Sequence, residues 1–308
     1  MRLKNAKDAS YVHGWENYRA VASYDRENWF RVETTYQDGE LIISHKPDFN
    51  SVYYAYFAPY SMERHHDLIS QAAEDDKVKM HVIGETLDGQ DIDLLTIGDM
   101  AVGKKVIWVI ARQHPGETMA EWCVEGFLER LLDEDDALSR QLLEKAVFYV
   151  VPNMNPDGSR RGHLRTNACG ANLNREWEDP SLERSPEVFY VRGKMDETGV
   201  DLVLDCHGDE ALPYNFIACF EGNADVDPAQ LDLAYDYQRH LMQVNPDFQM
   251  TVGTNQLAHR YNAVSMTLEM PFKDTIDSPN SHTGWSPERS NKLGRSQLDA
   301  LAGIIDRL

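Results

Sequence analysis

The order of apolar and polar residues divides the chain into a short strand-rich start and a longer region in which strands and helices alternate. The first 57 residues hold β-branched and aromatic runs separated by turn signals such as Asp38-Gly39, which predicts a small antiparallel β unit. The expected strands cover residues 18–24, 29–36, 40–44 and 51–57. The Ala58-Pro59 step marks the expected boundary of this unit.

From residue 58 onward, continuous apolar runs alternate with amphipathic segments. Residues 106–111 form an apolar run typical of a strand buried on both faces, and residues 119–132 repeat apolar positions at helical spacing. Further strands are expected at 78–86, 91–97, 146–151, 200–205 and 264–270, and further helices at 62–73, 186–198, 229–243 and 286–308. This alternation predicts an α/β fold with a mixed, mostly parallel sheet covered by helices on both faces. Ligands of such sheets bind at the carboxyl ends of the strands.

Composition and charge exclude several classes of partner. Lys and Arg total 30 against 51 for Asp and Glu, a formal net charge of −21, so a general surface for nucleic acid or anionic membranes is not expected. No apolar run approaches the roughly 20 residues that span a bilayer, and the N-terminus shows no secretory signal. The four cysteines have no C-x-x-C pairing, which favours free thiols and a cytoplasmic location. The oligomeric state is left open.

Candidate metal ligands follow two of the buried strands. His114 and Glu117 are separated by Pro-Gly, and a turn there lets an imidazole and a carboxylate three residues apart reach one zinc ion. The same spacing at His13 and Glu16 lies in the β-rich start without a partner motif, so we interpret it as structural. A zinc hydrolase needs a third ligand, and His207 lies at the end of another buried strand.

Two further residues near these strand ends, Cys206 and Glu269, could be functional or structural. Cys206 precedes His207, and successive strand residues face opposite sides, so we predict that Cys206 belongs to the core. Glu269 lies in an otherwise apolar strand, where a carboxylate is costly without a partner or a task. Burial raises the pKa of such a group and a nearby zinc lowers it, which is typical of a general base. The alternative is a strand-edge glutamate that faces solvent.

Polar residues also crowd the loop after the strand at 146–151. This loop contains arginines and asparagines that can bind a carboxylate or polarise a carbonyl, in the segments Asn155–Gly158, Arg165–Asn167 and Asn172–Trp177. The alternative is a solvated loop whose arginines pair with the surplus acids.

The motifs His-Pro-Gly-Glu, Asn-Pro-Asp-Gly, Arg-Thr-Asn, Asn-Leu-Asn-Arg, the strand-end histidine and Thr-Leu-Glu occur in the order found in zinc metallocarboxypeptidases. From Tyr54 to Lys273 the chain resembles the branch called cytosolic carboxypeptidases, which are deglutamylase-like, and their bacterial relatives. The resemblance implies an N-terminal β-sandwich at residues 1–57, abbreviated or incomplete, and a catalytic domain at residues 58–308. It implies one zinc ion held by His114, Glu117 and His207.

The resemblance also implies roles for other residues. Glu269 matches the general base, Arg165 the carbonyl-polarising arginine, and Asn174 with Arg175 the pair that holds the substrate's terminal carboxylate. Where many relatives have an acid that orients the first zinc histidine, this chain has Asn172, whose amide oxygen accepts a hydrogen bond without charge.

The implied activity is zinc-dependent removal of amino acids from the C-terminal tails of peptides or proteins, through a metal-activated water. An N-acyl amino-acid or murein-peptide amidase on the same fold and a non-catalytic peptide-binding protein are the alternatives. Arg160 and Arg161 lie near Arg165 and Arg175, and such a positive patch would favour acidic residues upstream of the scissile bond. Residues 253–256, a candidate lining of the specificity pocket, offer no cation.

Overall fold

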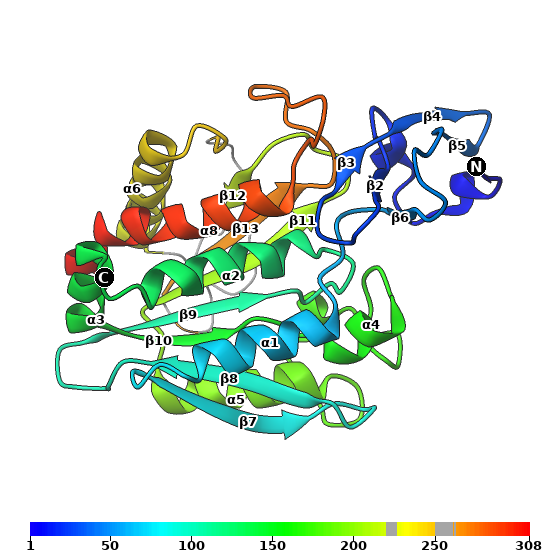
Figure 1. The fold of residues 1–308 in the computed structure, drawn as a ribbon. Helices are drawn as coiled ribbons and strands as arrows, with labels where there is room; N and C mark the ends of the chain where they lie inside the picture. The colour runs from blue at the N-terminus through cyan, green and yellow to red at the C-terminus, as the bar shows by residue number, and fades with distance from the viewer. Residues whose placement is uncertain (220–226, 250–260, 262) are drawn as a thin grey trace.

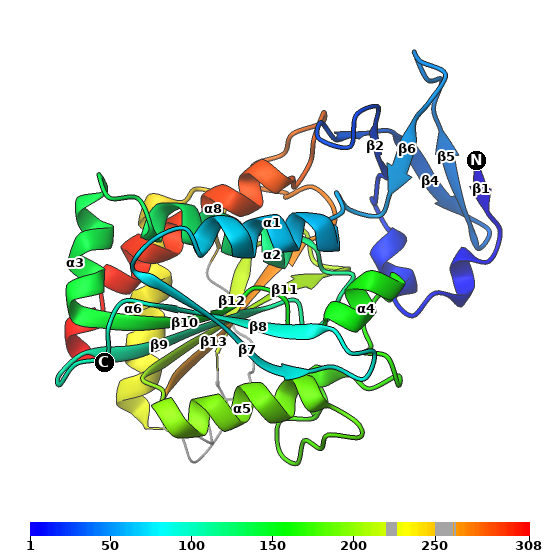
Figure 2. The same ribbon diagram turned by 60° about the horizontal axis from the view of Figure 1, so that its bottom comes forward.

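A mixed seven-stranded sheet forms the middle layer of the molecule (Figures 1 and 2). The computed structural model describes residues 1–219, 227–249, 261 and 263–308, so the segment 253–256 lies outside the described residues. The strands are, in spatial order, β12 (Phe216–Ala218), β13 (Val264–Pro271), β11 (Leu202–Asp209), β9 (Lys105–Ala111), β10 (Ala146–Val151), β8 (Asp91–Ile97) and β7 (Val78–Glu85). The four strands from β13 to β10 run parallel and the outer strands antiparallel, which confirms the predicted mixed sheet.

Helices cover both faces of this sheet. Figure 2 shows α1 (Met62–Ala72), α2 (Met119–Leu131) and α8 (Pro287–Ala302) on one side and α5 (Pro186–Thr198) on the other. The remaining described helices are α3 (Ala137–Lys145), α4 (Pro156–Arg161) and α6 (Pro228–Val244). Alternate residues of β9 enter two separate apolar cores: Ile107 and Val109 face α2, whereas Trp108 and Ile110 face α5.

The first residues form a small unit of two three-stranded antiparallel sheets. One sheet pairs β1 (Arg2–Leu3), β5 (Glu40–Ser44) and β4 (Glu33–Gln37), and the other β3 (Phe30–Arg31), β2 (Val21–Ser23) and β6 (Tyr53–Ala55). The short 3₁₀ helices η1 (Ala6–Asp8) and η2 (Val12–Trp15) precede β2. Ala22 of β2 and Ile43 of β5 share one apolar cluster, so the two sheets pack as a single small body.

Polar contacts attach this unit to the larger one. Arg31 is 5% exposed, and its guanidinium donates to the carbonyl oxygens of Phe272 at 2.8 Å and Trp285 at 3.1 Å. Lys273, also 5% exposed, donates to the carbonyl of Glu16 at 2.7 Å. A buried cation is stable only where such acceptors surround it, so these carbonyl contacts fix how the two units meet.

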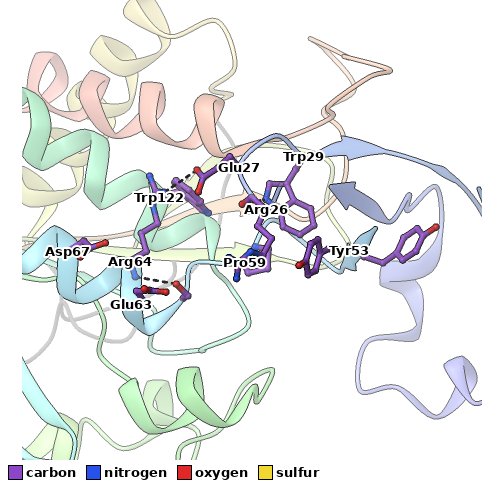
Figure 3. A pocket seen from close by; sticks show the side chains of 11 residues that line it. Arg26, Glu27, Trp29, Tyr53, Pro59, Glu63, Arg64, Asp67 and Trp122 are labelled. Atoms are coloured by element: carbon purple, nitrogen blue, oxygen red, sulfur yellow. Dashed lines mark hydrogen bonds and ion pairs between the residues drawn. The ribbon is translucent and has the colours of Figure 1, made fainter. Parts of the chain in front are cut away.

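A hollow of about 510 Å³ lies at the same junction (Figure 3). The Arg64 guanidinium of α1 lies 4.0 Å from the ring centroid of Trp122 in α2 and forms a 3.8 Å ion pair with Glu27 of the N-terminal unit. On the opposite wall, Arg26 lies over the ring of Tyr53. The hollow is thus lined by arginines that already have aromatic or acidic partners.

The structure differs from the sequence-based expectations in a few elements. β11 extends to Asp209 and therefore includes His207, whereas the expected strand ended at 205. α8 ends at Ala302 and is followed by the 3₁₀ turn η4 (Ile305–Arg307), so the C-terminal apolar stripe is not one continuous helix. The pattern missed α3, α4 and β12, each of nine residues or fewer. None of the described helices is long and apolar enough to cross a membrane.

Candidate metal centre

Three buried side chains converge at the carboxyl ends of the parallel strands. His114 and Glu117 lie in the turn between β9 and α2, and His207 lies near the end of β11. Glu117 is 2.7 Å from Nδ1 of His114 through Oε1 and 2.9 Å from Nδ1 of His207 through Oε2. Within the described part of the chain, these three residues are the one group of this kind at metal-binding distance. Residues from distant parts of the sequence thus meet at one point.

The hydrogen bonds of the two histidines fix which nitrogen is free for a metal. Nε2 of His114 lies 3.0 Å from Oδ1 of Asn172, and Nε2 of His207 lies 3.0 Å from Oδ2 of Asp205. Both partners are acceptors, so each Nε2 carries the proton and each Nδ1 keeps its lone pair. The two Nδ1 atoms are 3.1 Å apart beside the Glu117 carboxylate. Two imidazoles and one carboxylate are a donor set that zinc hydrolases use, so these residues fit zinc.

The electrostatic environment of the three side chains also favours a bound cation. Burial opposes ionisation of Glu117, but His114 and His207 outweigh burial and hold the pKa of that carboxyl well below its usual range. Burial disfavours a charged His207, yet Asp205 and Glu117 raise the pKa of His207 well above its usual value. Without a metal ion, His207 would therefore hold an extra proton between the two histidines and Glu117. Binding of a metal ion there releases that proton.

A cavity of about 310 Å³ is lined by two of these residues, His114 and Glu117, and by Gly208 next to the third. Glu269 on β13 is paired in register with His207 on β11, so the two side chains leave the sheet on the same face. Burial raises the pKa of Glu269 well above its usual range, and its Oε2 has no hydrogen-bond partner in the described structure. Arg165 also lines the cavity, with Nη1 3.6 Å from Oε1 of Glu117. The carboxyl of Glu269 and the guanidinium of Arg165 thus both lie in the wall of this cavity.

Asn174 and Arg175 lie in the same cavity wall, on the 3₁₀ turn η3 (Leu173–Arg175). Oδ1 of Asn172 accepts from the amide of Asn174 at 3.1 Å and faces Nε2 of His114 at 3.0 Å. One amide oxygen therefore caps the turn and orients a histidine. Arg175 is exposed, and Nη1 donates to the carbonyl of Asn174 at 2.9 Å, which leaves other N–H groups for a ligand.

Several supporting residues were not identified from the sequence. Nε2 of Gln113 donates to Asp205 at 2.6 Å, and its Oε1 accepts from Trp177 at 2.8 Å. Asn155 caps α4 through Gly158 and donates to the carbonyl of Gln113 at 3.0 Å, so the Asn-Pro-Asp-Gly motif holds the metal loop in place. The position of Asp205 two residues before His207, on the same strand face, was the signal available for its role.

Other sequence-based expectations have mixed outcomes. Cys206 is buried in the apolar core on the α2 side, as predicted. His13 and Glu16 are not part of the metal group found among the described residues. Arg161 forms an ion pair with Asp88 at 2.6 Å, and neither it nor Arg160 belongs to the described lining of the cavity. Of the four arginines expected at the cleft, Arg165 and Arg175 line the cavity.

Comparisons with known proteins agree with this geometry. Residues 66–213 match the family described as zinc carboxypeptidase, and residues 1–57 match the cytosolic carboxypeptidase N-terminal domain. A metallo-carboxypeptidase from Pseudomonas aeruginosa, crystallised with (2-guanidinoethylmercapto)succinic acid, is 43% identical, with a TM-score of 0.94. The match covers 99% of this chain and 86% of that one. An uncharacterized protein of Zymomonas mobilis is 56% identical over 99% of this chain and 83% of its own length.

The similarity to animal relatives is more limited. Human cytosolic carboxypeptidase 1 is 32% identical over 167 residues, which is 49% of this chain and 13% of the human protein. The match therefore concerns a small part of that relative, and the activity of the whole human protein does not follow from it.

Proposed function

Because this chain belongs to the zinc carboxypeptidase family, we propose that it removes amino acids from the C-termini of peptides or proteins. The observation that carries the proposal is a buried group of three side chains at metal-binding distance, two of which line a cavity together with a carboxyl that has an unpaired oxygen and two arginines. We assign residues 58–308 to the catalytic domain, with residues 1–57 packed against it, and place the protein in the cytoplasm.

In this proposal His114, Glu117 and His207 hold zinc, which when bound polarises the scissile carbonyl and lowers the pKa of water. Glu269 accepts the proton of the attacking water and passes it to the leaving amine. Burial raises the pKa of Glu269 and so makes its carboxylate a stronger base, and the charge of bound zinc would lower that pKa so that the group is ionised. Arg165 donates to the oxygen on which negative charge develops.

Arg175 and Asn174 bind the terminal carboxylate and so limit cleavage to chain ends. A planar guanidinium binds a carboxylate through two parallel hydrogen bonds, and an amide adds a neutral donor. The P. aeruginosa relative holds a succinic acid derivative, whose carboxylates are groups of the kind that this pair would bind.

The first test is zinc analysis of the purified protein combined with mass spectrometry of a peptide library after incubation. Loss of single C-terminal residues from free-acid peptides is expected. C-terminal amidation should lower kcat/KM about as much as Arg175→Ala does, and the two changes together should cost little more than one alone. Equal cleavage of free-acid and amidated peptides would indicate the amidase alternative. Binding without any cleavage would indicate a peptide-binding protein.

A further inference from the structure

A buried carboxyl that the proposed mechanism does not use lies in the wall of the metal cavity. Glu210 directly follows β11, is 5% exposed and lines the same cavity as Arg165 and Glu269. Its Oε1 has no hydrogen-bond partner within the described part of the chain. Burying a carboxyl oxygen without a partner is costly, and such an oxygen is retained where a ligand supplies the partner.

The N-terminal unit supplies aromatic neighbours to this carboxyl. Tyr11, between η1 and η2, lines the cavity, and its ring centroid is 5.3 Å from the guanidinium carbon of Arg165. Gly14 packs directly on Glu210: a Cβ added there would lie 3.0 Å from the Glu210 carbonyl oxygen and 3.4 Å from the hydroxyl of Tyr56. A side chain at position 14 would push this wall apart, so the glycine keeps the two units in contact around Glu210.

The charges around Glu210 favour a cation over an anion. Burial, followed by the charge of Glu117, raises the pKa of Glu210 to about 7. Asp209 is adjacent, with Oδ1 occupied by the amides of Ala211 at 2.8 Å and Leu212 at 2.6 Å. A substrate carboxylate here would meet these acids. An ammonium or guanidinium group would pair with Glu210 and lie beside a tyrosine ring, both of which stabilise a cation.

We propose that Glu210 and Tyr11 form a subsite for a cationic group, an ammonium or guanidinium, carried by the substrate on the N-terminal side of the scissile bond. This inference rests on the proposed function, because Arg175 then holds the opposite, C-terminal end of the peptide. The cation is either the side chain of a lysine or arginine or the free α-amino group of a short peptide. The subsite reverses the preference for acidic upstream residues that the arginines of the loop suggested.

The test uses short free-acid peptides that share their C-terminal residue and carry lysine, norleucine or glutamate just before it. Each is prepared with a free and with an acetylated N-terminus. For the zinc-loaded protein we expect kcat/KM of the lysine peptide to exceed that of the norleucine peptide by about tenfold or more. If instead each free peptide exceeds its acetylated match by this factor, whichever residue precedes the C-terminal one, the bound cation is the α-amino group.

Variants separate Glu210 from general effects of buried acids. Glu210→Gln should abolish most of the cation advantage, and Tyr11→Leu should reduce it by about two- to fivefold. The matched control is Glu187→Gln, since Glu187 is also buried with a pKa raised to about 7 but lies on α5 against Asn167, away from the described cavity lining. The control should leave the ratio unchanged.

Binding measured without turnover keeps this inference distinct from the proposed function. Calorimetry on the Glu269→Gln protein should give a Kd about tenfold lower for the cationic peptide than for its neutral match. Equal Kd values, or a ratio that Glu210→Gln leaves intact, would overturn the subsite and leave the carboxypeptidase proposal standing. Release of no C-terminal residue from any peptide would overturn the proposed function, while the Kd comparison would still decide the subsite.

Discussion

Two buried clusters of histidine and carboxylate side chains flank the turn after β9. They differ in whether the histidine nitrogens and carboxylate oxygens converge on one point or already have separate hydrogen-bond partners. The metal cluster consists of His114, Glu117 and His207. The second, which we call the closed cluster, consists of His65, Asp93, Arg112 and Glu121. In the metal cluster both Nδ1 atoms and a carboxylate meet at one point. In the closed cluster every one of these groups already has a partner.

The hydrogen bonds of the closed cluster show this directly. Nδ1 of His65 lies 2.6 Å from Glu121 and Nε2 lies 3.1 Å from Asp93, so neither ring nitrogen is free. The other oxygen of Glu121 accepts from Arg112 at 2.6 Å. Arg112 also donates to the carbonyl of Pro115 at 2.9 Å, inside the metal loop. Similar residue types therefore make a ligand site in one place and a structural brace in the other.

The largest contrast should appear when histidines of the two clusters are replaced. His207→Ala or His114→Ala should lose bound zinc together with activity, because two remaining ligands hold zinc poorly. His65→Gln should keep the zinc content while lowering Tm. Metal analysis and differential scanning calorimetry of the same preparations measure both. Retention of one zinc per chain by His207→Ala would refute the ligand assignment.

Glu269→Gln should separate metal binding from proton transfer. The variant should keep zinc and the fold, yet lose about two to four orders of magnitude in kcat, because its amide cannot accept the proton of water. Zinc analysis and steady-state kinetics provide the comparison. Near-wild-type turnover would exclude Glu269 as the base.

The partners of the two metal histidines differ in charge, which gives a finer test. Asp205 faces His207 as an acid, whereas Asn172 faces His114 as a neutral amide. Asp205→Asn should weaken zinc affinity by about 10- to 100-fold, and Asn172→Asp should strengthen it by a smaller factor. Competition with a chelating dye measures both affinities. Stronger zinc binding by Asp205→Asn, or weaker binding by Asn172→Asp, would show that charge at these positions does not set ligand strength.

The last test concerns the pH dependence of stability. Burial disfavours the charge on His65, but its hydrogen bonds to Asp93 and Glu121 outweigh burial and raise the pKa of His65 to about 9. A pKa raised by folding stabilises the protein fully below the unfolded value of about 6.5, and that stability is lost as the pH rises through 9. Denaturant unfolding at saturating zinc should therefore show a loss of about 3 kcal/mol from pH 6.5 to pH 9.5, beyond any loss in His65→Gln. Parallel curves for the two proteins would contradict a charged His65.

The sequence pattern predicted those strands and helices that are specified by residues close together in the chain. The bounds of β8, β10 and α5 match the expected segments because apolar runs and capping residues specify them over a few residues. β12 has three residues and exists only through its pairing with β13. A strand of that length carries no periodicity of its own, so its position depends on the sheet.

The residues of the candidate site likewise include some that short motifs predict and others that only tertiary packing brings together. The residues of the candidate metal centre stand in recognisable motifs at strand ends, so the sequence indicated them. Gln113 and Trp177 form their hydrogen bond across 64 residues, and Arg161 reaches Asp88 across 73. Tyr11 reaches the cavity from the N-terminal unit. Such pairings arise from the packing of whole elements, which spacing along the chain does not record.

The guanidinium of Arg31 has a consequence for how the protein is made. Arg31 leaves the ribosome early, whereas its acceptor at Phe272 follows 241 residues later. Until then this buried cation lacks carbonyl oxygens that it meets in the native state. We therefore expect the segment around Arg31 to reach its native contacts with the larger unit only after residue 285 has been synthesised, which leaves this surface open to chaperones and proteases during translation.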